Sequence, residues 1–122
     1  MRPSILILES RRDVADALHA VITSANYRAV IMPYVDRLAD LETRPAAIVT
    51  CITSVGIGEP AYVAIERLRD DRPPVVAIAW AEHEIAEALR LKCEVVLRAP
   101  MDLARLCDAL TTIVYARPEA SA

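Results

Sequence analysis

The chain has 122 residues, of which 55% are hydrophobic and 25% charged, so it has material for one core, and disorder is not expected. A net charge of −3 without a basic cluster excludes nucleic acid as an expected partner. The first apolar run, residues 5–8, is too short for a signal peptide or a membrane span. We therefore expect one cytoplasmic domain over residues 1–122, with no membrane partner.

The first part of the chain reads as strand, helix and strand. Residues 5–8 form an apolar run with β-branched side chains, which is typical of a strand buried on both faces. Ser10 is followed three residues later by Asp13, an acidic relative of the capping box, and helical spacing continues to Ala25. Residues 28–32 form the second predicted strand, which Pro33 ends.

The middle of the chain repeats this alternation. Residues 35–41 have helical spacing over a short length, and residues 46–52 form another buried strand. A loop with both glycines of the chain, Gly56 and Gly58, follows that strand. Pro60 then suits the first turn of a third helix, because proline is favoured where the backbone N–H has no helical partner.

The last part of the chain adds two more strands and two more helices. Residues 74–80 and 93–98 are predicted strands, and residues 82–91 between them are a predicted helix. After Ala99-Pro100, an amphipathic helix carries its apolar side chains at helical spacing: Leu103, Leu106, Leu110, Ile113 and Val114. Five buried strands that alternate with five helices predict an α/β fold with a parallel sheet covered on both faces.

The cysteines and the strand-to-helix turns offer little chemistry. Three scattered cysteines, Cys51, Cys93 and Cys107, predict neither a disulfide framework nor a metal site. The first strand-to-helix turn has no glycine, which excludes a dinucleotide site, and Lys92, the one lysine, is far from any glycine, which excludes a P-loop. We expect no cofactor.

Several segments resemble the receiver domains of two-component response regulators. These segments are residues 5–10, the third strand ending at Cys51, the start Pro74-Val75-Val76 of the fourth strand, and residues 96–102. The resemblance extends from about residue 4 to residue 115 in topology and hydrophobic pattern. It implies a flavodoxin-like receiver fold, with a five-stranded parallel sheet in the order 2-1-3-4-5, helices on both faces, and a cis Ala99-Pro100 bond.

The same resemblance implies where a phosphorylation site would lie. In that family, an acidic pair and an aspartate hold Mg²⁺, the aspartate accepts a phosphoryl group, and a hydroxyl and a lysine contact its oxygens. The corresponding positions in this chain are Glu9, Ser10, Cys51, Ala79 and Ala99. Glu9 alone keeps the required chemistry. We therefore expect a degenerate phosphorylation pocket.

These replacements remove what phosphoryl transfer needs. Mg²⁺ prefers several oxygen ligands, so one carboxylate beside a hydroxyl and a soft thiol is a weak site. A thiol cannot take the place of a carboxylate that forms an acyl phosphate, and without lysine no fixed cation stabilises the transferring group. We expect no enzymatic activity and no bound metal.

Three features remain as candidates for other roles. Cys51 could act as a redox switch, but the neighbouring Glu9 would raise its thiol pKa, which favours an inert buried cysteine. Trp80 is expected at the mouth of the pocket, either as a plug over it or as a contact for a partner. The expected partner face, taken from the family, consists of Glu87, Arg90, Val96 and Arg105.

Two functions follow. The first is a pseudo-receiver, a phosphorylation-independent protein–protein interaction module in bacterial two-component signalling. Its partner would be another signalling protein, a kinase or a regulator, or a second copy in a homodimer. The alternative is a small-molecule or redox sensor that uses the vacated pocket around Cys51 and Trp80. The sequence fits a stand-alone domain and equally a receiver cut from a longer protein.

Overall fold

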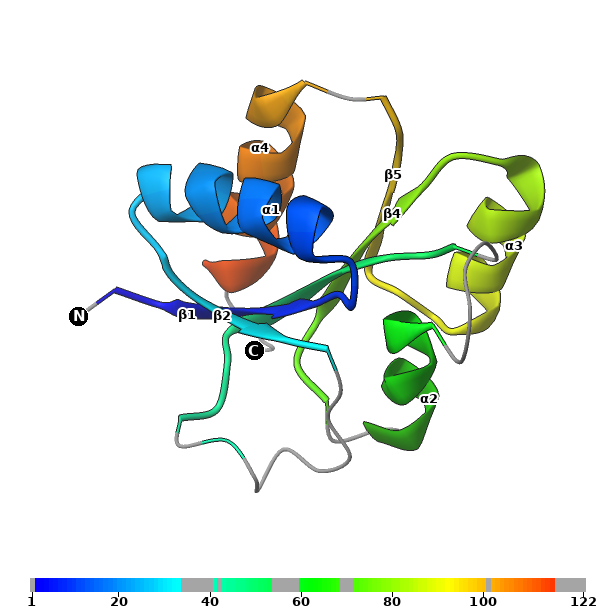
Figure 1. Ribbon diagram of the computed structural model, residues 1–122, viewed down its shortest axis with the longest axis horizontal. Coiled ribbons are helices and arrows are strands. Elements are labelled where there is room, and N and C mark those ends of the chain that lie inside the picture. Colours follow the sequence, from blue (N-terminus) through cyan, green and yellow to red (C-terminus); the bar gives the residue numbers. More distant parts are fainter. Residues whose placement is uncertain are drawn as a thin grey trace, which may run out of the picture.

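Among the described elements, helices follow β1, β3, β4 and β5, as the sequence predicts (Figure 1). The computed structural model describes residues 2–33, 41, 43–53, 60–68, 72–100 and 102–115. In chain order, the elements are β1 (Ser4–Leu8), α1 (Arg12–Ser24), β2 (Arg28–Met32), β3 (Ala47–Cys51), the 3₁₀ helix η2 (Ala61–Val63), α2 (Ala64–Leu68), β4 (Val75–Ala79), α3 (Glu82–Arg90), β5 (Val95–Arg98) and α4 (Leu103–Val114).

The five strands form one parallel sheet in the order β2-β1-β3-β4-β5. The register places Ile7 of β1 between Ile31 of β2 and Val49 of β3. This order confirms the predicted flavodoxin-like receiver fold. Because all strands run the same way, their carboxyl ends meet at one edge of the sheet, where open α/β sheets bind ligands.

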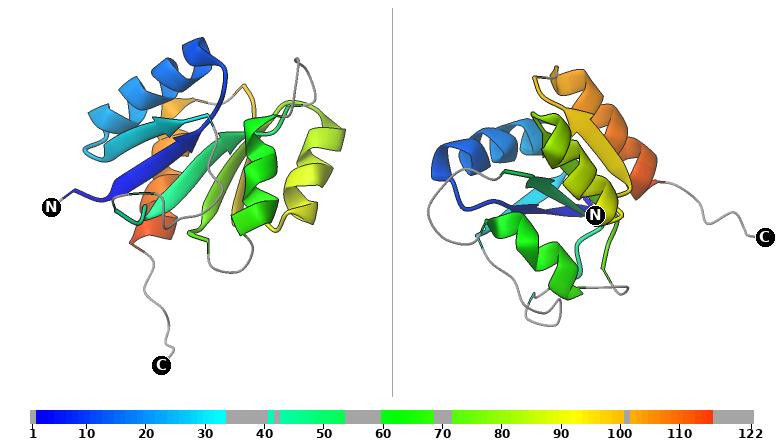
Figure 2. Two further views of the ribbon diagram at one scale, coloured as in Figure 1. Left: turned by 60° about the horizontal axis from the view of Figure 1, so that its bottom comes forward. Right: turned by 90° about the vertical axis from the view of Figure 1, so that its right-hand side faces the viewer.

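Two hydrophobic cores, one on each face of the sheet, explain why the strands are mainly apolar. Side chains alternate between faces along a strand, so Ile5 and Ile7 pack with α1 and α4, whereas Leu6 and Leu8 pack with α2 and α3. The turned views show α1 and α2 on opposite sides of the sheet (Figure 2). Strands β3 and β4 are buried along their whole length, as expected of central strands covered on both faces.

The start of α1 differs from the sequence-based expectation. The N-cap is Arg11, and no side chain caps the helix in the way predicted for Ser10, which is exposed. Ser10 stands one residue too early, and the Glu9 carboxylate instead accepts a hydrogen bond from the Arg11 N–H. The helix ends close to the predicted Ala25, and Asn26 follows with φ 73°, a left-handed conformation that asparagine tolerates.

The structure tests some of the remaining predictions, and others fall on residues that it does not describe. The helix expected over residues 35–41 falls in a stretch of which only Leu41 is described, and Gly56 and Gly58 lie outside the described residues. The Ala99-Pro100 bond is cis, as the resemblance implies. Within the described parts of the chain, no helix combines the length and the apolar character needed to cross a membrane.

Buried side-chain oxygens tie the carboxyl ends of the strands together. Thr50 is fully buried in β3, and its Oγ1 donates a hydrogen bond of 2.8 Å to the carbonyl oxygen of Leu8 in β1. Glu84 in α3 is also buried, and its Oε1 accepts from the N–H of Trp80 at 2.8 Å and of Ala81 at 3.0 Å. These bonds hold the end of β4 to α3 and the end of β3 to β1.

The Thr50 bond can be tested with a nearly isosteric substitution. We expect Thr50→Val to lower the free energy of unfolding by about 1 kcal/mol, because a buried hydrogen bond is lost without a change in volume. The matched control is Thr112→Val, since Thr112 is exposed on α4 and donates to the Asp108 carbonyl at 2.9 Å; its loss should stay below about 0.5 kcal/mol. Urea unfolding measures both. Equal losses would show that the Thr50 bond adds nothing specific.

Candidate functional site

The carboxyl edge of the sheet gathers the five positions predicted as a degenerate phosphorylation pocket. Cys51 and Ala79 end β3 and β4, and Ala99 directly follows β5. All three are buried, as is Glu9 after β1, whereas Ser10 is exposed. The edge therefore carries one buried carboxylate, one buried thiol and two buried methyl groups at these positions.

The Glu9 carboxylate is already paired. Its Oε2 accepts hydrogen bonds from the backbone N–H of Arg11 at 2.9 Å and from Arg11 Nε at 3.2 Å. Burial alone would lower the pKa of Arg11, but the hydrogen bond and the charge of Glu9 outweigh it and raise that pKa. Glu9 is 4% exposed, and a carboxylate so buried needs such a partner. Glu9, the acid that the sequence analysis placed in the pocket, thus binds Arg11 at the start of α1.

Cys51 is held in its thiol form. Burial, followed by the negative charge of Glu9, raises the pKa of Cys51 to about 12, although Arg11 opposes the shift. The thiolate is the reactive form of cysteine. This environment favours an inert cysteine and speaks against the redox form of the sensor hypothesis.

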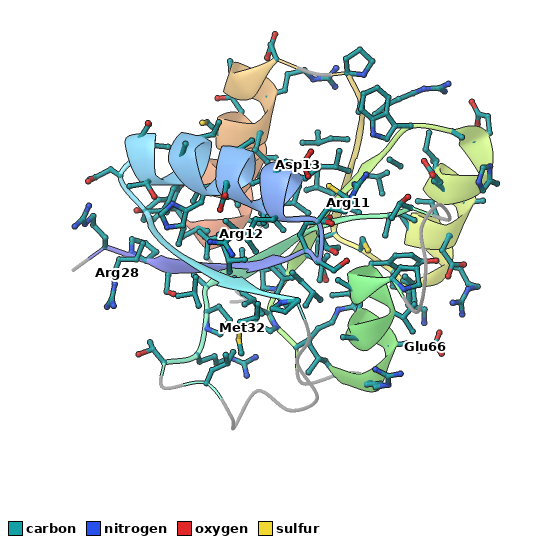
Figure 3. All side chains as sticks on the ribbon, viewed as in Figure 1. Arg11, Arg12, Asp13, Arg28, Met32 and Glu66 are labelled. Atoms are coloured by element: carbon teal, nitrogen blue, oxygen red, sulfur yellow. The ribbon has the colours of Figure 1, made fainter. Side chains whose placement is uncertain are left out.

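A cavity of about 500 Å³ opens between α1, the ends of β3 and β4, the segment after β5, and α4. We call it the α1–α4 cavity. Cys51, Trp80 and Ala99 line it, with Arg11 and Asp13 from the start of α1. In Figure 3, Arg11 and Asp13 lie beside the first turn of α1, on the side of β4 and β5.

The structure divides the predicted pocket positions. Cys51 and Ala99 share the α1–α4 cavity, but Glu9 and Ser10 line a different cavity of about 540 Å³ between α1 and β2. Ala79 belongs to the core on the α2 and α3 side. Successive residues of a strand point to opposite faces of the sheet, so Ile78 and Ala79 lie on opposite faces. Cys51 pairs with Ile78 and packs in the same core, so it lies on the face opposite Ala79. The five positions share an edge without forming one pocket.

Trp80 lies at the mouth of the α1–α4 cavity. Its side chain is among those that line the cavity, yet the residue is 58% exposed. The indole therefore forms part of the wall without closing the opening. Its backbone N–H is bound by Glu84, so the position of the residue is fixed from α3.

The residues of the predicted partner face flank β5 on both sides of the sheet. Glu87 and Arg90 of α3 form an ion pair of 2.8 Å, and Arg90 also reaches Glu66 of α2 at 2.9 Å. Val96 is half-buried against the core on that side. Arg105 is exposed on α4, which packs on the other side. The structure thus joins Glu87 and Arg90 directly, and Arg105 stands apart from them.

The described residues hold no group of three His, Cys, Asp or Glu side chains that could bind a metal ion. Arg11, which the sequence reads as part of a solvated helix start, pairs with Glu9 and lines the α1–α4 cavity. The signal for it was available in the spacing of Glu9 and Arg11, two residues apart across a strand-to-helix turn. Asp13, taken only as a helix-start residue, lines the cavity as well.

Comparisons with known proteins find similarity in three dimensions. No protein-family model and no curated protein sequence matches the chain. A response regulator receiver protein from Burkholderia phymatum superposes with a TM-score of 0.75 and 16% identity, over 93% of this chain and 95% of that one. The signal receiver domain of a signal transduction histidine kinase from Syntrophus aciditrophicus gives 0.76 and 16%, over 97% and 96%.

A sensor protein from Polaromonas sp. JS666 superposes with a TM-score of 0.73 and 19% identity, over 93% of this chain and 97% of that one. The match extends over nearly the whole length of each of these chains. At such identities the similarity establishes the fold, which is that of receiver domains.

The reactivity of Cys51 tests the electrostatic description of the site. In the variant Cys93→Ser/Cys107→Ser, Cys51 is the sole cysteine. Near pH 8, a thiol with a pKa of about 12 is only about one ten-thousandth thiolate, so iodoacetamide should modify it about a thousandfold more slowly than an ordinary exposed thiol. The rate should rise with pH, because deprotonation becomes easier. Intact mass against time gives the rate.

The control is Cys51→Ser/Cys93→Ser, which leaves Cys107, a partly exposed thiol on α4. Both variants should react fully once unfolded in urea. If Cys51 in the folded chain reacted as fast as Cys107, the thiol would have to be activated and the redox hypothesis would return.

Proposed function

We propose that this chain is a pseudo-receiver, a phosphorylation-independent protein–protein interaction module of bacterial two-component signalling in the cytoplasm. Its output is contact with another signalling protein, a kinase or a regulator, or with a second copy of itself. The observation that carries the proposal is the pairing of Glu9 with Arg11, at 2.9 and 3.2 Å, beside the buried thiol of Cys51.

The chemistry of the edge supports the absence of phosphoryl transfer. A Mg²⁺ ion would have to take Glu9 from Arg11 and would find a thiol and an exposed hydroxyl as the neighbouring ligands at these positions, whereas it prefers several oxygens. Ala79 and Ala99 place methyl groups where a transferring phosphoryl group needs donors and a cation. The negative charge on a phosphoryl group in transfer would therefore be poorly stabilised at these positions.

A second candidate, a small-molecule sensor, is favoured by the α1–α4 cavity. Its volume of about 500 Å³ falls within the range of about 300 to 1,000 Å³ that is typical of small-molecule sites. Cys51, Trp80 and Ala99 line it, so the cavity occupies part of the place that the sequence analysis assigned to a vacated pocket. The two candidates differ in their ligand, a protein or a small molecule.

Incubation with acetyl phosphate and Mg²⁺ tests the first candidate. We expect intact mass to show no phosphoryl adduct, because no carboxylate stands at position 51 and no cation at position 99. The control Ser10→Asp/Cys51→Asp/Ala79→Thr/Ala99→Lys restores the full set of groups and should gain an adduct. A stable adduct on the unmodified chain would contradict the proposal.

Charge reversal tests the partner face. If the predicted partner face carries the contact, Arg105→Glu should weaken binding of a kinase or regulator from the same cell by about tenfold, because reversing the charge replaces attraction to the partner's rim by like-charge repulsion and slows association. Arg28→Glu is the matched control, since Arg28 is also exposed but lies on β2, the opposite edge of the sheet. Surface plasmon resonance gives the rates. Equal effects would place the contact elsewhere.

A further inference from the structure

We propose that the α1–α4 cavity binds a small, uncharged aromatic molecule, which stacks on Trp80 and points a polar edge toward Arg11 and Asp13. This inference rests on the sensor candidate and specifies its ligand. It is independent of the proposal that phosphorylation has been lost.

The walls of the cavity are mainly apolar and come from several elements. Val14, Leu18 and Val21 extend from α1, Ile78 from β4 and Leu106 from α4. A site with this lining gains most from removing a hydrophobic ligand from water. The exposed indole of Trp80 at the mouth supplies a flat face, and aromatic rings gain additional energy from offset or edge-to-face contact with such a face.

The charges around the cavity disfavour an anionic ligand. Arg11 is the cation among the lining residues, and its Nε is already bonded to the 4% exposed Glu9. An anion that drew Arg11 toward itself would weaken the pairing of a buried carboxylate, which is costly. Asp13 at the same rim adds a second negative charge that repels an anion.

A cationic ligand is disfavoured as well. It would have to leave water for apolar walls while the positively charged Arg11 lines the same cavity. An uncharged ligand avoids both penalties. The guanidinium of Arg11 and the carboxylate of Asp13 then offer one donor group and one acceptor group to the polar edge of the ligand, an amide or a hydroxyl (Figure 3).

The test uses two probes that differ in charge and hardly in shape, para-iodobenzamide and para-iodobenzoate. Iodine quenches indole fluorescence on contact, and Trp80 is the chain's one tryptophan, so the signal reports on this residue alone. We expect saturable quenching by the amide. The benzoate should bind at least about tenfold more weakly, because its charge meets Asp13 and competes with Glu9 for Arg11.

Two substitutions on α1 separate binding in the cavity from chance collisions with an exposed indole. Ala17 is exposed and lines the cavity, so Ala17→Phe should fill its mouth and abolish the saturable quenching. Ala20 is exposed on the same helix and is not among the lining residues, so Ala20→Phe should leave it unchanged. Both variants place the same side chain on the surface of the same helix, and circular dichroism confirms that both fold.

The outcomes are distinguishable. Saturable quenching by the amide alone, lost in Ala17→Phe and kept in Ala20→Phe, supports the proposal. Equal saturation by both probes overturns the inference about charge and leaves the sensor candidate standing. Quenching that rises linearly for both probes and ignores Ala17→Phe overturns the inference and the sensor candidate together, whereas the acetyl phosphate assay still decides the first candidate.

Discussion

The arrangement of the carboxyl edge of this sheet depends on one pairing, between the buried carboxylate of Glu9 and Arg11. Glu9 is almost fully buried, and the two hydrogen bonds from Arg11 satisfy it. Because removing such a partner would leave an uncompensated buried charge, Arg11 is held at the start of α1. Arg11 then forms part of the wall of the α1–α4 cavity, which Cys51 also lines.

The fold could be predicted closely because the strands read as short, mainly apolar runs, and the central strands β3 and β4 are buried along their whole length. The predicted bounds of the second strand, 28–32, agree with β2 (Arg28–Met32). The fifth strand, predicted from residue 93, begins at Val95. The reason is local: the Cys93 N–H donates to the Ala88 carbonyl, and Lys92 has φ 61°, so residue 93 still belongs to the end of α3.

The site could be predicted less well because it depends on side-chain directions. Sequence placed Glu9, Cys51, Ala79 and Ala99 at one edge, which topology alone determines. Their distribution over two cavities and the opposite core depends on the face that each residue takes at the end of its strand. The helix start is a similar case: the capping pattern predicts a side-chain cap from Ser10, whereas the N-cap is Arg11 and its N–H donates to the carboxylate of Glu9.

The two hydrogen bonds that Glu84 accepts from Trp80 and Ala81 have a mechanical consequence. They clamp the rim of the α1–α4 cavity to the first turn of α3, the helix that also carries Glu87 and Arg90. Any occupant that displaces the backbone at Trp80 must either drag that turn along or break both bonds. A change inside the cavity and the charged outer surface of α3 are thereby connected, in part through the carboxylate of Glu84.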